Sequence, residues 1–299
     1  MEPNKYLQAI EQCEVATDEA KIKAQVAHLL NTHFAENSNP DVYQFLLNCI
    51  DLTTLSSEDS DQSVAKFVSK VNDFEEKYAE YGNVAAICVY SNFASVVRQT
   101  LETNAVKVAV CSGNFPSSQA RLEVKTIETS LAVADGADEV DIVLNLGYFT
   151  DGAYEELSDD ISEICQAARS CNDAARVKVI LETGALQSAE NIKRASVLAM
   201  YSGADFIKTS TGKMYPGASV EAAYVMCKCI KDYYEKHGRM VGFKAAGGVR
   251  TAADAVKYYT IVKEVLGEEW LTPEWFRIGA SSLANNLFSD IIGEEAKPF

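Results

Sequence analysis

The chain has 299 residues, 47% of them hydrophobic, and a formal net charge of −16. This length fits two ordinary domains or one large α/β barrel. The acidic balance argues against nucleic acid as a partner but allows an anionic substrate in a local cationic pocket. No apolar run approaches the roughly 18 residues of a membrane span, and the first residues lack a signal peptide's basic and apolar regions. We therefore expect a cytoplasmic protein with no membrane partner.

The number and positions of the cysteines and histidines argue against several kinds of catalytic and metal site. Eight cysteines in a chain of this length indicate reduced thiols rather than a disulfide framework. The three histidines, His28, His33 and His237, do not follow predicted strands. This argues against Ser–His or Cys–His catalysis and against a histidine-bound metal. We expect neither a metal nor a cofactor.

The first 45 residues show helical spacing of apolar side chains. The spacing covers Tyr6–Cys13, Ile22–Leu30 and Val42–Leu47, with a polar break at Glu36–Pro40. We interpret residues 1–45 as a helical extension that packs on the main domain.

From residue 46 onward, short apolar runs alternate with segments of helical spacing. Candidate N-caps at Ser188, Ser219 and Thr251 precede three of these helical segments. The runs are almost continuously apolar, as expected of parallel strands covered on both faces. There are eight of them: Leu46–Leu52, Val84–Tyr90, Val106–Cys111, Glu139–Asn145, Val177–Glu182, Asp205–Thr209, Val241–Ala245 and Phe276–Ala280.

Eight strand–helix units in about 250 residues predict an α/β protein, a (β/α)8 TIM barrel over residues 46–293 with a tail at 294–299. An open, doubly wound sheet is the alternative. Its usual Gly-x-Gly-x-x-Gly turn after the first strand is absent from the sequence.

Reactive groups of such barrels gather at the carboxyl ends of the strands. Lys208 and Lys244 each close an apolar run, where burying an ammonium group is costly. Two such groups in one pocket favour the neutral, nucleophilic amine by lowering its pKa. The other polar or reactive side chains at strand ends are Asp51, Thr53, Cys88, Cys111, Asp141, Glu182, Ser281 and Ser282.

We assign provisional roles to these strand-end residues. Lys208 is the candidate nucleophile, since the hydroxyls of Thr209–Thr211 follow it and could hold a substrate's hydroxyls. Lys244 is then its electrostatic partner. Asp141 is either a general acid–base group or one half of a structural ion pair, and Asp51 is a second such group or an anchor for Lys244. We interpret the two strand-end cysteines as packing residues.

Glycine-containing turns indicate an anion site. Gly247–Arg250 follows the seventh predicted strand and Gly279–Ser282 the eighth, and both run into helix starts. Helix N-termini favour anions, and the loops after these two strands are a frequent phosphate site in barrels. Gly212–Lys213 would add a third wall.

Six segments closely resemble the deoxyribose-phosphate aldolase family: residues 51–55, 85–90, 136–141, 205–213, 242–250 and 279–283. The resemblance extends from about Leu46 to Leu287. It implies a class I, metal-free aldolase that reversibly splits 2-deoxyribose 5-phosphate into acetaldehyde and glyceraldehyde 3-phosphate. A homodimer is a further expectation at family level.

The resemblance also implies roles for single residues. Lys208 would form the Schiff base, Lys244 would depress its pKa, and Asp141 would move protons with support from Asp51. The residues expected to bind substrate hydroxyls or phosphate are Thr211, Gly212, Lys213, Gly247, Gly248, Val249, Arg250, Gly279, Ser281 and Ser282.

Three features depart from the family pattern. Some members end in a tyrosine that assists proton transfer, whereas Phe299 has no hydroxyl. The segment Leu144–Tyr148 and the extension before residue 45 also vary within the family. Two other functions remain open: a different sugar-phosphate aldolase, such as a transaldolase-like enzyme, and a phosphosugar-binding protein without catalysis.

Overall fold

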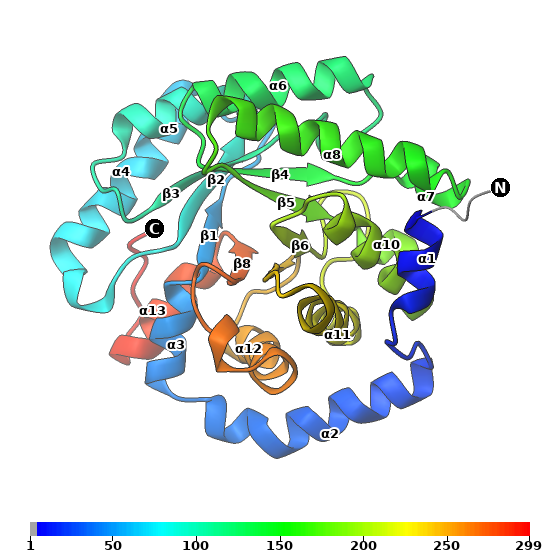
Figure 1. Ribbon diagram of the computed structural model, residues 1–299. Coiled ribbons are helices and arrows are strands. Elements are labelled where there is room, and N and C mark those ends of the chain that lie inside the picture. Colours follow the sequence, from blue (N-terminus) through cyan, green and yellow to red (C-terminus); the bar gives the residue numbers. More distant parts are fainter. Residues whose placement is uncertain (1–4) are drawn as a thin grey trace.

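The computed structural model describes residues 5–299, and its centre is a closed barrel of parallel strands in sequence order (Figure 1). This confirms the predicted (β/α)8 barrel and not the open sheet. The strands are β1 (Ile50–Thr53), β2 (Ala86–Tyr90), β3 (Lys107–Cys111), β4 (Glu139–Val143), β5 (Arg176–Ile180), β6 (Phe206–Lys208), β7 (Gly242–Ala246) and β8 (Phe276–Ala280).

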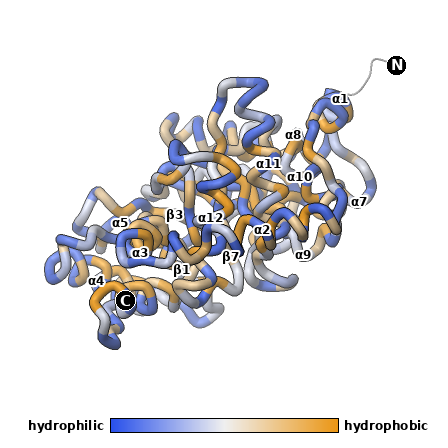
Figure 2. Tube along the Cα trace, turned by 90° about the horizontal axis from the view of Figure 1, so that it is seen from below, coloured by the Kyte–Doolittle hydropathy of each residue, from blue (hydrophilic) through white to orange (hydrophobic). Residues whose placement is uncertain are grey.

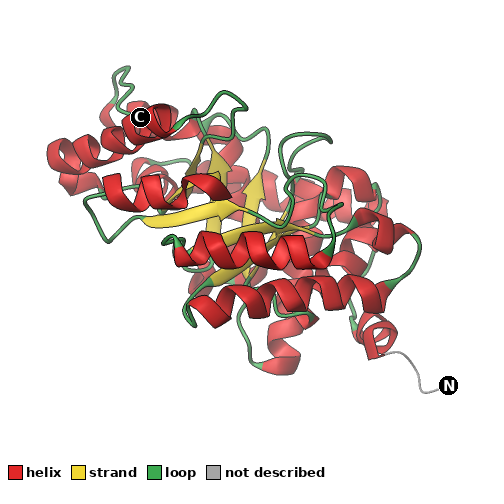
Figure 3. Cartoon of the chain, turned by 90° about the horizontal axis from the view of Figure 1, so that it is seen from above, coloured by secondary structure: helices red, strands yellow, loops and turns green. Residues whose placement is uncertain are grey.

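Helices surround the strands on the outside (Figure 3). Ser188, Ser219 and Thr251 cap three of them, as predicted, because each side chain accepts a hydrogen bond from a backbone N–H in the first turn. The helices that follow β1 are α4 (Asp61–Tyr78), α5 (Ala94–Thr100), α6 (Leu122–Ala134), α7 (Leu146–Thr150), α8 (Tyr154–Cys171), α9 (Thr183–Leu186), α10 (Ala189–Tyr201), α11 (Val220–His237), α12 (Ala252–Leu266) and α13 (Leu283–Ile292).

The first predicted strand begins later than expected. Leu46 and Leu47 form the last turn of α3 (Pro40–Leu47), and β1 starts only at Ile50. Asn39 caps α3 and Pro40 occupies its first turn, so the helix is specified at its start. A buried apolar run has no periodicity that separates helix from strand, and this caused the error.

The helices before β1 lie along the outside of the barrel wall. They are α1 (Lys5–Gln12), α2 (Glu19–Asn37) and α3, which pack on α10, on α11 and α12, and on α12 and α13 respectively (Figure 1). Ile22 and Val26 of α2 are buried in these contacts. No helix among residues 5–299 is long and apolar enough to cross a membrane.

The apolar core fills the space between strands and helices. In Figure 2 hydrophobic segments concentrate inside the molecule, while many loops at its margin are hydrophilic. Most strand residues are buried, which explains the nearly continuous apolar runs. The polar residues buried within the strands are therefore the exceptions that require an explanation.

The last residues pack against the barrel's helices. The Phe299 ring is buried, with its centroid 4.5 Å from that of Phe74 in α4. The Asn285 side chain exchanges two hydrogen bonds with the Phe299 backbone. Phe299 is thus fixed between α4 and α13.

Candidate active site

Strand register places the two strand-end lysines side by side. Lys208 on β6 and Lys244 on β7 are direct register partners. Their Nζ atoms both hydrogen-bond to Oδ2 of Asp141, each at 2.7 Å. Side chains of equal register point to the same face of a sheet, so both lysines face the barrel interior. Two amines therefore share one carboxylate oxygen.

Asp51 contacts Lys244 on the side away from Asp141. Its Oδ2 accepts a short hydrogen bond from Nζ of Lys244, while Oδ1 lies 2.6 Å from a guanidinium nitrogen of Arg277. The Arg277 guanidinium also bonds to both carboxylate oxygens of Glu139, at 2.8 and 3.0 Å. Arg277 therefore links two carboxylates inside the barrel.

Lys178 on β5 completes the arrangement. Its Nζ lies 2.9 Å from Oδ1 of Asp141, 2.6 Å from Glu139 and 3.4 Å from Asp51. Together these side chains form a buried set that we call the charge cluster. Its members are Asp51, Glu139, Asp141, Lys178, Lys208, Lys244 and Arg277.

Proximity of opposite charges controls the protonation of the cluster. Burial alone would raise the carboxyl pKa values of Asp51, Glu139 and Asp141, but the surrounding cations outweigh it and hold all three below their ordinary range. Burial would lower the pKa values of Lys178 and Lys244, but the carboxylates outweigh it and raise both. Asp141 is thus ionised and Lys244 is charged.

The cluster contains one more cationic side chain than carboxylates. Lys178 contacts three carboxylates, and Lys244 and Arg277 contact two each. Lys208 contacts one carboxylate oxygen and shares it with Lys244. An uncompensated charge in a buried site is costly. Lys208 is the cationic side chain of the cluster with the fewest carboxylate partners.

Sequence reasoning did not assign three members of the cluster. These three are Glu139, Lys178 and Arg277, to which the sequence pattern assigns no role. They sit within strands, below the strand ends where reactive groups of such barrels are expected. A charged side chain between two buried apolar residues, as in Val177–Val179 and Phe276–Ile278, is the signal that would have identified Lys178 and Arg277.

Glu182 belongs to the loop structure and not to the charge cluster. Its carboxylate accepts hydrogen bonds from the backbone N–H of Thr211 at 3.1 Å and from the Thr211 hydroxyl at 2.5 Å. Nζ of Lys213 donates to the carbonyl of Leu55 in the loop after β1. These contacts fix the loop after β6 across the barrel mouth.

The glycine turns lie close together at the mouth. Ala246 and Gly279 are register partners, so the loops after β7 and β8 leave the barrel next to each other. A Cβ atom on Gly217 would lie only 2.2 Å from the carbonyl oxygen of Gly247. The loop after β6 therefore packs directly on the loop after β7. Ser281 and Ser282 are exposed and immediately precede α13.

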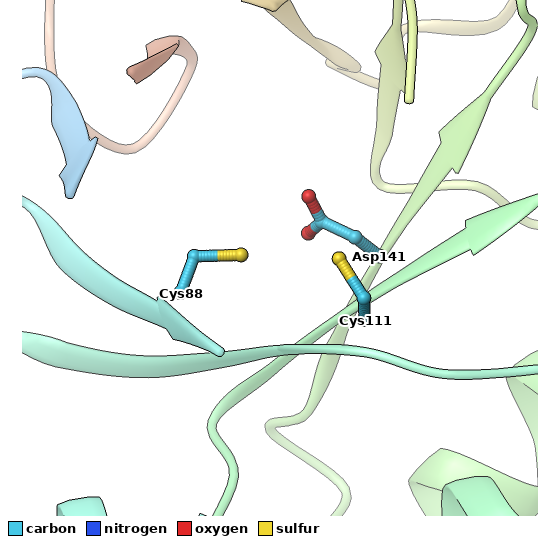
Figure 4. A group of neighbouring side chains, drawn as sticks. All are labelled: Cys88, Cys111 and Asp141. Carbon is cyan, nitrogen blue, oxygen red and sulfur yellow. The ribbon is translucent and has the colours of Figure 1, made fainter. Parts of the chain in front are cut away.

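Two cysteines form the wall beside Asp141 (Figure 4). The sulfur atoms of Cys88 and Cys111 and a carboxylate oxygen of Asp141 all lie within 4.8 Å of one another. The hydrogen bond with Cys88 and burial both raise the pKa of the Cys111 thiol. Both thiols pack with Ala86 and Ala109 in a small apolar cluster. Since lysines hold both oxygens of Asp141, we assign the thiols to packing and not to metal binding.

A parallel eight-stranded barrel whose interior holds adjacent lysines around an ionised carboxylate defines a class I aldolase, a lyase that acts through a lysine Schiff base. The chain belongs to the DeoC/LacD family of aldolases, whose model matches residues 45–286.

Related proteins agree with this membership. A deoxyribose-phosphate aldolase of Mus musculus is 40% identical over 251 residues, covering 80% of this chain and 77% of that protein. The human enzyme of the same name is 40% identical over 248 residues, with the same two coverages. A tetrameric deoxyribose phosphate aldolase from Aeropyrum pernix superposes with a TM-score of 0.67 at 27% identity, covering 88% of this chain and 96% of that one.

Proposed function

We propose that this protein is a 2-deoxyribose-5-phosphate aldolase that reversibly forms acetaldehyde and glyceraldehyde 3-phosphate. The observation that carries the proposal is the single oxygen of Asp141 between Nζ of Lys208 and Nζ of Lys244. It places the amine of Lys208, the cation of Lys244 and the ionised carboxylate of Asp141 in direct contact. The family membership and the names of the relatives supply the substrate.

The chemistry proceeds through the cluster's own groups. Neutral Lys208 attacks the aldehyde carbon of the open-chain sugar, and loss of water gives an iminium ion. Asp141, directly or through a water, takes the proton from the hydroxyl at carbon 3. The bond between carbons 2 and 3 then breaks, and its electron pair enters the enamine on Lys208. Protonation of the enamine and hydrolysis release acetaldehyde. Lys244 stays charged throughout.

The phosphate group is assigned to the glycine loops after β6, β7 and β8. Backbone N–H groups near the starts of α12 and α13 can bind an anion there, with Lys213 and Arg250 as the nearby cations. The Ser210 hydroxyl is buried and has no hydrogen-bond partner in the described chain. It adjoins Gly247, because a Cβ on Gly247 would lie 3.7 Å from Cβ of Ser210. A bound substrate would satisfy this orphaned group.

The surface formed by the thiols of Cys88 and Cys111 beside Asp141 is assigned to contact with the two-carbon product, acetaldehyde. Cys88, Cys111 and the nearby alanines are small and apolar, and they adjoin the carboxylate that would move protons. A methyl or methylene group needs such a surface next to the reacting amine. The proposal also includes a cytoplasmic location, supported by eight free cysteines of which seven are buried. It further includes a homodimer, as expected from the family resemblance.

Borohydride trapping tests the Schiff base directly. The protein is incubated with acetaldehyde and sodium borohydride, digested, and analysed by mass spectrometry. We expect a two-carbon adduct on Lys208 and none in the Lys208→Met variant. An adduct confined to other lysines, or none at all, would refute the proposed nucleophile.

A substrate panel separates the remaining candidates. The enzyme should cleave 2-deoxyribose 5-phosphate far faster than fructose 6-phosphate or other phosphorylated ketoses. Preferred cleavage of a ketose phosphate would indicate the transaldolase-like activity instead. Binding of a phosphosugar without adduct or turnover would indicate a binding protein.

A further inference from the structure

One buried carboxylate uses both hydrogen-bond donors of a residue in the loop after β6. Oε1 of Glu182 accepts from the backbone N–H of Thr211 at 3.1 Å, and Oε2 accepts from the Thr211 hydroxyl at 2.5 Å. Glu182 is 1% exposed and Thr211 is 7% exposed. Hydrogen bonds to a carboxylate are stronger than those between neutral groups, and burial makes their loss costly. Glu182 therefore fixes Thr211 from two sides.

The backbone around Glu182 directs this carboxylate across the barrel mouth. The N–H of Leu181 donates to the carbonyl of Lys208 at 2.8 Å. The N–H of Thr183 donates to the carbonyl of Thr209, also at 2.8 Å. The chain after β5 thus advances by two residues where the chain after β6 advances by one, and Glu182 is the additional residue. An inserted residue of this kind redirects a side chain, and such insertions concentrate next to active sites.

Glu182 also has a backbone conformation that is costly for its residue type. Its φ is 55° and its ψ is 58°, in the left-handed region that favours glycine. A non-glycine residue stays in this region only where the surrounding structure requires it, most often at functional sites. The two hydrogen bonds to Thr211 are what this side chain contributes in return. Both the backbone and the side chain of Glu182 therefore serve the loop after β6.

Thr211 transmits this constraint to the turn that follows it. Its hydroxyl oxygen accepts a hydrogen bond from the backbone N–H of Lys213 at 3.1 Å. Between them, Gly212 has a φ of 74° and lies against Gly247 of the loop after β7, since a Cβ on Gly212 would be 3.9 Å from the Gly247 Cα. Both donors of Thr211 are engaged by Glu182, so neither is left for a phosphate oxygen. The role of Thr211 in this loop is to set the position of residues 212 and 213.

We propose that Glu182 is a positioning residue for the phosphate group of the substrate, acting through Thr211 on the turn at residues 211–213. The proposal deepens the assignment of phosphate to the glycine loops and rests on the proposed function. No hydrogen bond or ion pair within residues 5–299 joins Glu182 to the charge cluster. Glu182 should therefore determine how tightly a phosphorylated sugar binds, and leave the chemistry at Lys208 unchanged.

Steady-state kinetics of Glu182→Gln tests this separation. Glutamine keeps the shape of the side chain, but its amide nitrogen cannot accept a hydrogen bond, so one buried donor of Thr211 loses its partner. We expect KM for 2-deoxyribose 5-phosphate to rise about tenfold or more, with kcat within about threefold of wild type. For unphosphorylated 2-deoxyribose, kcat/KM should stay within about twofold. A fall in kcat at unchanged KM, or equal losses for both sugars, would overturn the proposal.

Glu128→Gln is the matched control. The Glu128 carboxylate on α6 likewise accepts two hydrogen bonds, from the backbone N–H of Asn114 and from the Ser91 hydroxyl, each at 2.8 Å. It holds the loop after β3, to which no phosphate contact is assigned. KM for 2-deoxyribose 5-phosphate should stay within about twofold of wild type in this variant. A rise equal to that of Glu182→Gln would show general loosening of the mouth and overturn a specific role for Glu182.

Substitutions of Thr211 test whether Glu182 acts through it. Thr211→Val replaces the hydroxyl by a methyl group and should raise KM for the phosphorylated sugar as Glu182→Gln does. Thr211→Ser keeps both donors and should retain most of the affinity. If the two residues act as one unit, the double variant Glu182→Gln/Thr211→Val should be little worse than either single variant. Fully additive losses would overturn the proposed path through Thr211.

Direct binding separates this proposal from the aldolase proposal. Calorimetric titration with inorganic phosphate should give a dissociation constant about tenfold or more higher for Glu182→Gln than for wild type. An equal constant for the two proteins, or no binding to wild type, would overturn the role of Glu182. Acetaldehyde carries no phosphate, so both proteins should form the borohydride adduct on Lys208. Phosphate binding that depends on Glu182 without any adduct would overturn the aldolase mechanism alone.

Discussion

At the scale of single residues, Lys178 shows what holds the reactive groups in place. Its Nζ contacts three carboxylates and is completely buried. We expect Lys178→Met to lower the free energy of unfolding by about 3–5 kcal/mol, because the remaining carboxylates would be left with too little positive charge. Urea unfolding measures the loss. Lys257→Met, which removes an exposed ion pair with Asp254, should cost under about 1 kcal/mol. Equal costs would contradict the structural role of Lys178.

Lys244 should control the reactivity of the Lys208 amine. The attacking amine must be neutral, and a charged group beside the same oxygen favours that state. Lys244→Leu should lower kcat/KM about 100-fold or more and move the acid limb of its pH profile to higher pH. Lys244→Arg retains the charge and should retain more activity than the leucine variant. An unshifted acid limb in the leucine variant would contradict the electrostatic role.

At the scale of elements, the sequence predicts the positions of the strands along the chain. It does not predict how deep in the barrel each strand residue lies. Lys208, Lys244 and Asp141 could be found because apolar runs end at or near them. Lys178 and Arg277 could be noticed as charged side chains within apolar runs, but their roles could not be assigned, because their partners come from other strands and only the barrel's closure brings them together. The order of strands and their register, which no local pattern specifies, determine these contacts.

The loops at the mouth depend on a close contact between two glycines. Gly217→Ala would place a Cβ atom against the carbonyl oxygen of Gly247 and push the loops after β6 and β7 apart. We expect KM for 2-deoxyribose 5-phosphate to rise about tenfold or more, since small displacements of positioning groups are costly. Turnover of unphosphorylated 2-deoxyribose serves as the internal control and should change little. A parallel loss for both sugars would indicate general disruption instead.

The segment after α13 has a structural role in this chain. Phe299→Ala should lower the free energy of unfolding by about 3 kcal/mol, because it removes an aromatic ring that packs on Phe74. Since Phe299 packs between α4 and α13 and contacts no member of the charge cluster, kcat should stay within about twofold of wild type, under conditions where the variant is folded. A large fall in kcat with unchanged stability would show that this segment reaches the active site.

At the scale of the whole molecule, the charge cluster links stability to acid. Folding holds the pKa values of Asp51, Glu139 and Asp141 below their ordinary range, and the unfolded chain takes up these protons near about pH 4. The stabilisation is complete above that pH and is lost as the pH falls. Each group contributes up to about 1.4 kcal/mol per pH unit to the slope.

Urea unfolding between pH 5 and pH 3 measures this dependence. The free energy of unfolding should fall steeply below about pH 4. The slope should exceed that expected from the surface carboxylates, which change their proton affinity little on folding. A flat profile through this range would mean that folding does not lower the pKa values of the three buried carboxyls.

The shared oxygen of Asp141 and the other ion pairs of the charge cluster also limit which substitutions the candidate active site can accept during evolution. Seven charged side chains on six strands compensate one another, so loss of one leaves others buried with fewer partners. Single replacements are therefore penalised, while balanced double replacements conserve the total charge. In a library that randomises Asp51 and Lys244 together, folded survivors should be enriched in pairs that keep this balance. We therefore expect the residues of the charge cluster to be replaced together rather than one at a time.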